Sequence, residues 1–182
     1  MSTEHNEKTI SSQVIYQGKV VTLRVDKVAL INGMTATREV IIHGGAAAVL
    51  AVNKDKEVYF VRQYRKAVEK ELLEIPAGKL DPGEEPRACA ERELAEETGL
   101  VAKEMRLLTA VYTSPGFASE KIYLYLATGL RETNNAQPDE GELLTVQKIP
   151  LSSALQMVQS GEITDAKTCL ALLLAAELGL NK

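Results

Sequence analysis

The chain has 182 residues, of which 45% are hydrophobic, and its formal net charge is −4. This length predicts one domain with a sizeable core and room for a small extra lobe. The negative charge argues against general binding to nucleic acid or to an anionic membrane, and no apolar run is long enough to cross a bilayer. The two cysteines, Cys89 and Cys169, lack the spacing of a disulfide framework or of a zinc site, so we expect a reduced, cytoplasmic protein.

The first 45 residues predict a disordered tail over residues 1–9 and an antiparallel sheet of three strands over residues 10–45. Its strand-like stretches are Val14–Tyr16, Val20–Ile31 and Ala36–His43. The dipeptide Asn32-Gly33 between the last two stretches is a strong hairpin signal. Three side chains of the middle stretch alternate and would share one face: Val21, Leu23 and Val25. So small a sheet cannot bury a core of its own, so it must pack on the rest of the chain or on a second subunit.

Residues 46–182 predict a second domain built of short strands and helices, and Gly44-Gly45 marks where it begins. Its strand-like stretches are Ala46–Val52, Val58–Tyr64, Leu72–Ile75, Met105–Thr113, Lys121–Ala127 and Leu143–Ile149. Two helices should follow the last strand. Ser152 would cap the first, to Gln159, and Thr164 or Asp165 would cap the second, to Leu178. The polar stretch from residue 131 to residue 141 should form a loop.

The segment GKLDPGEEPRACAERELAEETGL, from Gly78 to Leu100, predicts a helix that ends at Gly99. Its acids and Pro86 suit the first helical turn, and nothing before Gly99 interrupts the helix. Three glutamates fall on one arc of about 100°, with Arg92 beside them: Glu93, Glu96 and Glu97. The other side of the helix carries Ala88, Leu94 and Ala95.

An acidic helix face is most often only a solvated surface, but two observations argue against that interpretation here. Like charges four residues apart destabilise a helix by a few tenths of a kcal/mol, which a divalent cation would offset. The segment also matches Gly-x5-Glu-x7-Arg-Glu-U-x-Glu-Glu-x-Gly-U at every defined position, where U is aliphatic. In this motif the chain resembles the Nudix hydrolases, which cleave nucleoside diphosphates linked to another moiety.

The resemblance implies a metal site on this helix. Carboxylates would hold Mg²⁺, or Mn²⁺ as the alternative, which would neutralise the diphosphate and acidify a water molecule. Glu93 and Glu97 would be direct ligands, Glu96 a bridging ligand, and the backbone carbonyl of Ala77 a further ligand. Arg92 would orient these carboxylates.

The resemblance also implies a catalytic base outside the helix, in the stretch QPDEGE, because the helix carboxylates are committed to metal. Glu140 is the first candidate. Glu142 is the second candidate or an extra metal ligand, and Glu96 is the next in order. In the resembling enzymes such a glutamate swings over the substrate when it binds.

Outside the motif, the chain resembles the ADP-ribose pyrophosphatases of this family from about residue 12 to residue 179. The likeness rests on VRQYRKAVEKELLEIPAGKLDPGE, on YTSPGF followed by a glutamate, on DEGE, and on Pro115, fifteen residues after Leu100. It implies hydrolysis of ADP-ribose to AMP and ribose 5-phosphate. Four residues would bind this substrate: Arg65 at the diphosphate, Glu74 at the ribose or adenine end, Arg38 at the adenosine, and Gly116 in the SPGF turn.

The implied fold is α/β, a Nudix-type α/β/α sandwich with a mixed sheet, preceded by the three-stranded antiparallel sheet. The family shares this first sheet between the subunits of a homodimer. Two other functions stay open. One is a pyrophosphatase of another nucleoside diphosphate sugar, of the GDP-mannose type. The other is a non-catalytic nucleotide-sensing module, although such modules usually lose glutamates that this chain keeps.

Overall fold

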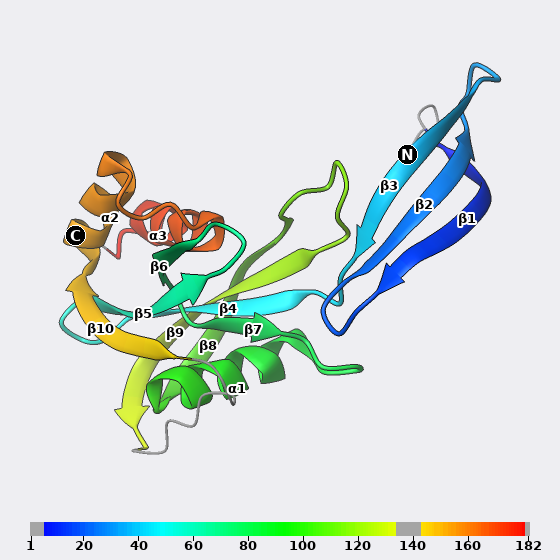
Figure 1. Cartoon of the computed structure of the whole chain (residues 1–182). Coiled ribbons are helices and arrows are strands. Elements are labelled where there is room, and N and C mark those ends of the chain that lie inside the picture. Colours follow the sequence, from blue (N-terminus) through cyan, green and yellow to red (C-terminus); the bar gives the residue numbers. More distant parts are fainter. Residues whose placement is uncertain (1–5, 134–142, 181–182) are drawn as a thin grey trace. The chain divides into compact units, whose positions relative to one another are not determined.

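The computed structural model describes residues 6–133 and 143–180, and these form two compact units. The first unit contains the described residues up to Gly45 together with Tyr112–Lys121. The second contains Ala46–Val111 and the described residues from Ile122 onward. The sequence predicts the division after residue 45, but it does not predict that residues 112–121 join the first unit. Figure 1 shows the elements of both units in chain order.

The first unit is an antiparallel sheet with the strand order β1-β2-β3. Its strands are β1 (Lys8–Gln17), β2 (Thr22–Ala29) and β3 (Thr35–Ile42). The predicted three-stranded sheet is therefore confirmed. The disordered tail predicted up to residue 9 is wrong at its last two residues, because β1 begins at Lys8. Gly33 has a φ of +81°, a left-handed conformation that glycine adopts without strain, and it turns the chain between β2 and β3.

Burial within β2 does not follow the predicted face. Val21, Leu23 and Val25 are only half-buried, whereas Asp26 and Val28 are each 4% exposed. Asp26 is covered because Ser12 and Arg24 donate hydrogen bonds to its carboxylate, at 2.5 and 3.0 Å. Local polar contacts therefore account for the burial of Asp26, which apolar alternation does not predict.

Residues 112–121 join the first unit through β3. The N–H of Ile41 donates to the carbonyl of Phe117 at 2.7 Å, and the N–H of Ser119 donates to the carbonyl of Ile41 at 2.9 Å. The Ser119 hydroxyl also accepts a hydrogen bond from the N–H of His43, at 3.0 Å. These contacts connect residues far apart in the sequence, so alternation along the chain could not predict them.

In its described residues, the second unit contains two sheets and three helices. The four-stranded sheet has the order β7-β4-β9-β8, and the three-stranded sheet has the order β10-β5-β6. The strands are β4 (Ala46–Ala51), β5 (Glu57–Arg65), β6 (Lys70–Glu74), β7 (Ala77–Lys79), β8 (Leu100–Tyr112), β9 (Lys121–Glu132) and β10 (Leu144–Pro150). The helices are α1 (Pro86–Thr98), α2 (Leu151–Ser160) and α3 (Ala166–Glu177). Because β4 pairs antiparallel with β7 and parallel with β9, its sheet is mixed, as predicted.

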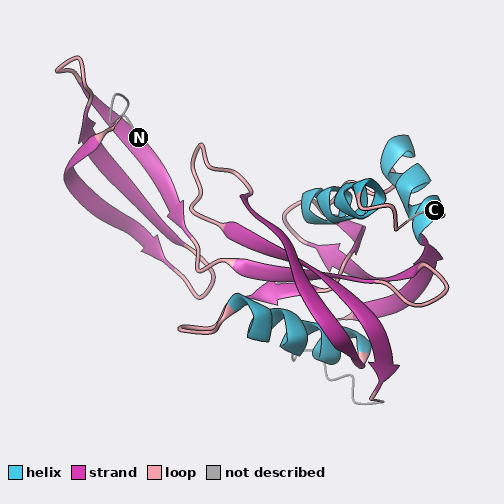
Figure 2. Cartoon of the chain, turned by 180° about the vertical axis from the view of Figure 1, so that it is seen from behind, coloured by secondary structure: helices cyan, strands magenta, loops and turns pink. Residues whose placement is uncertain are grey.

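Strand β4 is buried on both faces and separates two hydrophobic cores. Ala46, Ala48 and Leu50 belong to the core that contains residues of α2 and α3. The alternate residues of β4 belong to a second core with Cys89, Ala90 and Leu94 of α1. Figures 1 and 2 show α1 on one side of the strands and α2 with α3 on the other. The predicted α/β/α sandwich is therefore confirmed.

Three local predictions need correction. The buried apolar side of α1 is Cys89, Ala90 and Leu94, whereas Ala88 is exposed, because α1 turns its glutamates as well as its apolar residues toward the sheet. Ser152 does not cap α2, because β10 continues to Pro150 and the helix starts immediately after it. Strand β9 continues to Glu132, beyond its predicted end at residue 127.

The cap of α3, which the sequence leaves open between two residues, is Asp165. Its carboxylate accepts a hydrogen bond from the N–H of Thr168 at 3.0 Å. No helix in the described part of the chain is both long and apolar enough to cross a membrane.

Candidate active site

The acidic motif folds as the helix that its sequence predicts. Glu85 occupies the N-cap position of α1 and Pro86 its first turn. Gly99 ends the helix in a left-handed conformation, with a φ of +68°, and its N–H donates to the carbonyl of Ala95. The three glutamates of the predicted metal face therefore lie on one rigid helix, as the spacing requires.

Arg92 gathers three carboxylates of the motif around one guanidinium. It donates hydrogen bonds to Glu84 at 2.9 and 3.1 Å, to Glu93 at 2.7 Å and to Glu96 at 2.9 Å. The hydrogen bond from Arg92, aided by one from the N–H of Asp81, lowers the pKa of Glu84 to about 2. The three carboxylates in turn raise the pKa of Arg92, so this guanidinium stays charged at neutral pH.

Glu93 and Glu97 face β7 and are almost completely buried, with 9% and 3% of their surface exposed. Glu97 accepts a hydrogen bond from the N–H of Ala77 at 3.0 Å. Glu93 lies so close to Gly78 that a Cβ on that residue would be 1.7 Å from its Oε1 atom. The absence of a side chain at Gly78 is therefore what allows Glu93 to lie against β7.

The donor set fits a hard divalent cation, although the side chains are not already arranged around one. Among residues 6–133 and 143–180, no three Asp, Glu, His or Cys side chains form a ready-made metal site. Glu93 and Glu96 turn toward Arg92, and Glu97 turns toward the N–H of Ala77. The side chains of these three glutamates offer carboxylate oxygens, the ligands that Mg²⁺ and Mn²⁺ prefer. Their negative charges exceed the positive charge of Arg92. A bound cation would therefore take over part of the role of Arg92, which is to neutralise the negative charge of the glutamates.

Arg65 and Glu74, both predicted to bind substrate, bind each other. The Arg65 guanidinium donates two hydrogen bonds to the Glu74 carboxylate, at 2.7 and 2.8 Å. Lys167 of α3 contacts the same carboxylate, and Glu74 is only 1% exposed. Burial alone would raise the pKa of Glu74, but the hydrogen bonds and charges of Arg65 and Lys167 outweigh it and lower that pKa. Glu74 is therefore charged, and its two oxygens are used within the protein.

The Arg65 guanidinium remains partly open to solvent, with 39% of its side chain exposed. A guanidinium has five N–H donors, and Glu74 accepts two hydrogen bonds, so others remain for an anion. The pKa of Arg65 is raised chiefly by its hydrogen bonds to Glu74, with a smaller contribution from the charge of Glu97. Arg65 is therefore within electrostatic reach of the acidic helix.

In the first unit, Arg38 and Gly116 line one cavity of about 450 Å³. Arg38 forms an ion pair with Glu7, with hydrogen bonds of 2.9 and 2.5 Å. Two aromatic residues in the same lining, Tyr112 and Phe117, are more than half exposed. The sequence analysis missed both of them, although Phe117 belongs to the SPGF motif. Exposed aromatic rings beside an arginine can stack on a planar base.

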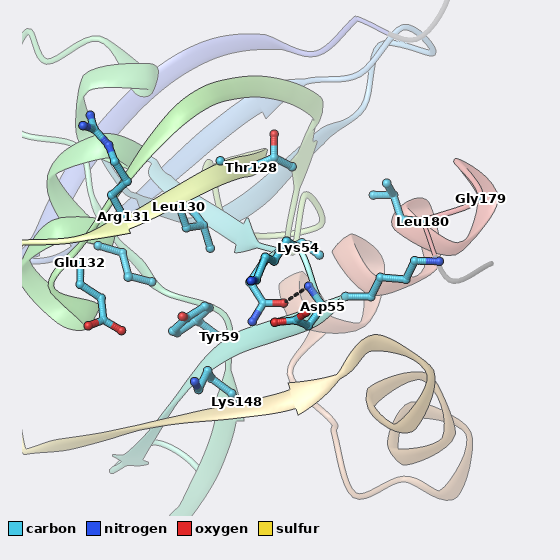
Figure 3. Close-up of a pocket in the computed structure, with 15 residues that line it drawn as sticks. Lys54, Asp55, Tyr59, Thr128, Leu130, Arg131, Glu132, Lys148, Gly179 and Leu180 are labelled. Atoms are coloured by element: carbon cyan, nitrogen blue, oxygen red, sulfur yellow. Dashed lines mark hydrogen bonds between the residues drawn. The ribbon is translucent and has the colours of Figure 1, made fainter.

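A larger cavity, of about 820 Å³, is lined by residues of β5, β8, β9 and β10, by the turn between β4 and β5, and by Gly179 and Leu180 after α3 (Figure 3). Tyr59 and Lys148 lie opposite each other on paired strands there, with the ammonium 5.8 Å from the ring centre. Tyr59 lies six residues before Arg65 on β5, a separation of about 20 Å along a strand. None of the predicted site residues that the structure describes lines this cavity. The carboxylates that could bind metal lie elsewhere, on α1.

The structure thus forms three groups from the predicted residues. The first is Arg92 with its glutamates and the neighbouring Ala77, the second is Arg65 with Glu74, and the third is Arg38 with Gly116. Glu140 and Glu142 lie outside the described residues. The sequence analysis also missed Lys167, which has no motif of its own and meets Glu74 only in the folded chain. Asp165, predicted only as a possible helix cap, pairs with Lys167 there.

Comparison with known proteins identifies related sequences over most of the chain. Residues 42–169 match the family described as "NUDIX domain", and residues 7–41 match "Nucleoside diphosphate sugar hydrolase N-terminal domain". A protein from Bacillus methanolicus named methanol dehydrogenase activator is 47% identical over 167 residues, which are 91% of this chain and 90% of that protein. The ADP-ribose pyrophosphatase of Bacillus subtilis (strain 168) has the same identity and coverage.

Two further matches extend the comparison. The GDP-mannose pyrophosphatase of Citrobacter koseri is 38% identical over 144 residues, which are 74% of this chain and 75% of that protein. A solved structure described as "Crystal structure of ADP compounds hydrolase" superposes with a TM-score of 0.85. The superposed residues make up 98% of this chain and 96% of the chain in that structure. Their sequences are 23% identical, so this match shows the fold alone.

Proposed function

The chain belongs to the NUDIX domain family, and on that premise we propose that it hydrolyses the diphosphate of ADP-ribose to AMP and ribose 5-phosphate. The observation that carries this proposal is the complete acidic motif, whose carboxylates lie on one helix around Arg92. The identity of 47% to an ADP-ribose pyrophosphatase over 91% of the chain supports this choice of substrate. Relatives of this kind depend on a divalent metal. We propose Mg²⁺, with Mn²⁺ as the alternative.

Each group of residues has a distinct part in this proposal. Glu93, Glu96 and Glu97, with the carbonyl of Ala77, hold the cation. A bound Mg²⁺ ion supplies positive charge at the diphosphate and lowers the pKa of a water molecule. Arg92 keeps the carboxylates oriented, which is supported by its three ion pairs.

The substrate itself is held by residues outside the motif. Arg65 binds the diphosphate through donors that Glu74 leaves free, which its exposure supports. Arg38 and Gly116 bind the adenosine, which the aromatic lining of their cavity supports. Glu140, or Glu142 beside it, is the base that activates the attacking water.

A second candidate substrate is another nucleoside diphosphate sugar of the GDP-mannose type, supported by the 38% identity to a GDP-mannose pyrophosphatase. A panel of nucleoside diphosphate sugars, assayed with Mg²⁺ and with Mn²⁺, tests the choice. Products are detected as phosphate released by an added phosphatase. We expect the highest kcat/KM with ADP-ribose. A higher kcat/KM with GDP-mannose would replace ADP-ribose as the substrate. A chain that turned over none of the panel would be a nucleotide-sensing module.

We also propose that residues 10–45 form a dimerisation sheet and that residues 46–182 form the hydrolase domain. All of β1 is exposed, and several large apolar side chains of the first unit are more than half exposed. They are Ile10, Val14, Ile15, Tyr16, Val20, Ile31 and Met34. A second copy of the chain would cover them. The two free cysteines support a reducing, cytoplasmic location.

A homodimer is therefore expected in solution, near twice the chain mass of 19.8 kDa. Light scattering coupled to size-exclusion chromatography measures this mass. Deletion of residues 1–44 is expected to give insoluble or inactive protein, because the sheet that forms the interface is removed. A full-length monomer that still hydrolyses ADP-ribose would rule out a site shared between subunits.

Replacing Gly78 with alanine is expected to lower kcat by about a hundredfold, because the added methyl group must displace the Glu93 carboxylate from β7. Gly83→Ala is the control. Gly83 has a φ of +81° but open space around its Cβ position, so alanine there strains the backbone without touching a ligand. Steady-state kinetics at saturating ADP-ribose and Mg²⁺ compares the two variants. Equal activities would show that contact with Gly78 does not position Glu93.

A further inference from the structure

A chain of charged side chains connects helix α3 to Arg65 at the end of β5. Lys167, in the first turn of α3, contacts Oε2 of Glu74, 93 residues away in the sequence. The same carboxylate accepts both hydrogen bonds from Arg65. Lys167 also donates to Asp165, the N-cap residue of α3, at 3.0 Å. Two cations and two carboxylates thus form one network.

The members of this network differ sharply in exposure. The side chains of Glu74, Lys167 and Asp165 are 2%, 12% and 15% exposed, whereas that of Arg65 is 39% exposed. Arg65 is the member that a ligand in solution can readily reach. The side chains of the other three residues are largely covered by the protein.

Lysine is an unfavourable residue in the first turn of a helix, because the free N–H groups there already create a positive potential. Asp165 offsets part of this effect, since its carboxylate binds Lys167 as well as the N–H of Thr168. The helix dipole of α3 therefore does not favour a lysine at this position. The contact that favours Lys167 is the long-range one to the buried carboxylate of Glu74.

Two cations share the Glu74 carboxylate, and this sharing has two physical effects. Lys167 occupies Oε2 and so fixes the plane of the carboxylate, which fixes the guanidinium bound to it. Lys167 also neutralises part of the negative charge of Glu74. The positive charge of Arg65 is then less compensated, so Arg65 attracts an anion more strongly. Both effects favour binding of a diphosphate at Arg65.

We propose that Lys167 is a positioning residue, which holds Arg65 ready for the substrate diphosphate through the carboxylate of Glu74. This inference rests on the proposed function, in which Arg65 binds that diphosphate. Lys167 itself makes no contact with the substrate. It acts on substrate binding, and the chemical step that the α1 carboxylates support does not depend on it.

The test is a double-mutant cycle of four chains: wild type, Lys167→Met, Arg65→Gln and the double variant. KM and kcat for ADP-ribose are measured at saturating Mg²⁺. Lys167→Met is expected to raise KM about tenfold, the size of one charge-assisted hydrogen bond, and to change kcat by less than about threefold. In the Arg65→Gln background the same change should alter KM by less than about twofold, because Lys167 acts through Arg65.

Thr168→Val is the matched structural control. The Thr168 hydroxyl accepts a hydrogen bond from the N–H of Ile75 at 2.9 Å and donates one to the Asp165 carboxylate at 2.6 Å. It therefore attaches α3 to the residue after β6, and it meets the charged network at Asp165 and not at Glu74 or Arg65. This variant is expected to lower Tm and to leave KM within about twofold of wild type. If Lys167→Met loses its fold, Lys167→Gln replaces it, since its amide is polar but uncharged.

Two results would overturn the inference: an equal rise in KM with and without Arg65, or the same rise in KM in Thr168→Val. A different result concerns the proposed function alone. If the wild-type chain does not hydrolyse ADP-ribose, that substrate is wrong, and the cycle is measured on whichever nucleoside diphosphate sugar the chain turns over.

Discussion

Glu97→Gln and Glu93→Gln are each expected to lower kcat by at least about a thousandfold, which corresponds to roughly 4 kcal/mol of transition-state stabilisation. Both carboxylates are nearly buried against β7, and each would lose the negative charge that a cation requires. Glutamine has almost the same shape as glutamate. Its amide oxygen can still accept the hydrogen bond that the N–H of Ala77 donates to residue 97.

The measurement is kcat at saturating ADP-ribose and Mg²⁺, with circular dichroism and Tm to show that the fold is kept. Glu91→Gln is the control on the same helix. Glu91 is half-exposed and pairs only with Arg87 in the described structure, so this variant should keep wild-type activity. Near-wild-type activity in either Glu97→Gln or Glu93→Gln would contradict the assignment of that residue as a ligand.

Glu140→Gln is expected to lower kcat about 10²–10⁴-fold, the usual contribution of a general base, with a much smaller effect on KM. Glu140 and Glu142 lie outside the described residues, and the reason for choosing them is chemical. A carboxylate bound to metal is too weak a base to take a proton from water at neutral pH. The base must therefore come from an acid that is not committed to the metal.

Both single variants, Glu140→Gln and Glu142→Gln, are assayed under the same saturating conditions. Glu132→Gln is the control, because Glu132 is an exposed residue at the end of β9 with no assigned role. If both variants keep more than about a tenth of wild-type kcat, less than about 1.4 kcal/mol has been lost. The base then lies elsewhere, and Glu96 of α1 is the next residue to replace.

The helix that carries the candidate metal ligands could be predicted from the sequence almost completely. Its limits follow from local chemistry, with Pro86 in the first turn and Gly99 after the last residue. The motif spacing also predicts that Arg92 lies beside the glutamates. Strand β4 could be predicted for the same kind of reason, because an uninterrupted apolar run is typical of a strand buried on both faces.

The remaining features depend on contacts between distant residues. Nothing local predicts that Lys167 meets Glu74, or that residues 112–121 pair with β3. The buried side of α1 also escaped prediction, because helical spacing shows which residues share a face but not which face meets the sheet. Likewise Asp26 is buried in β2 because Ser12 and Arg24 hydrogen-bond to it, which an apolar alternation cannot reveal.

The burial of β4 on both faces also determines how amide hydrogens exchange with solvent. This strand lies between β7 and β9 and contributes side chains to both cores, so its N–H groups can reach water only when the whole second unit opens. The amides of β1 belong to a fully exposed strand at the edge of its sheet and can exchange through small local openings. Since β7 and α1 both pack on β4, the backbone of α1 stays against the sheet until the second unit opens. The free energy of global unfolding therefore limits how often the helix that carries the candidate metal ligands leaves the sheet.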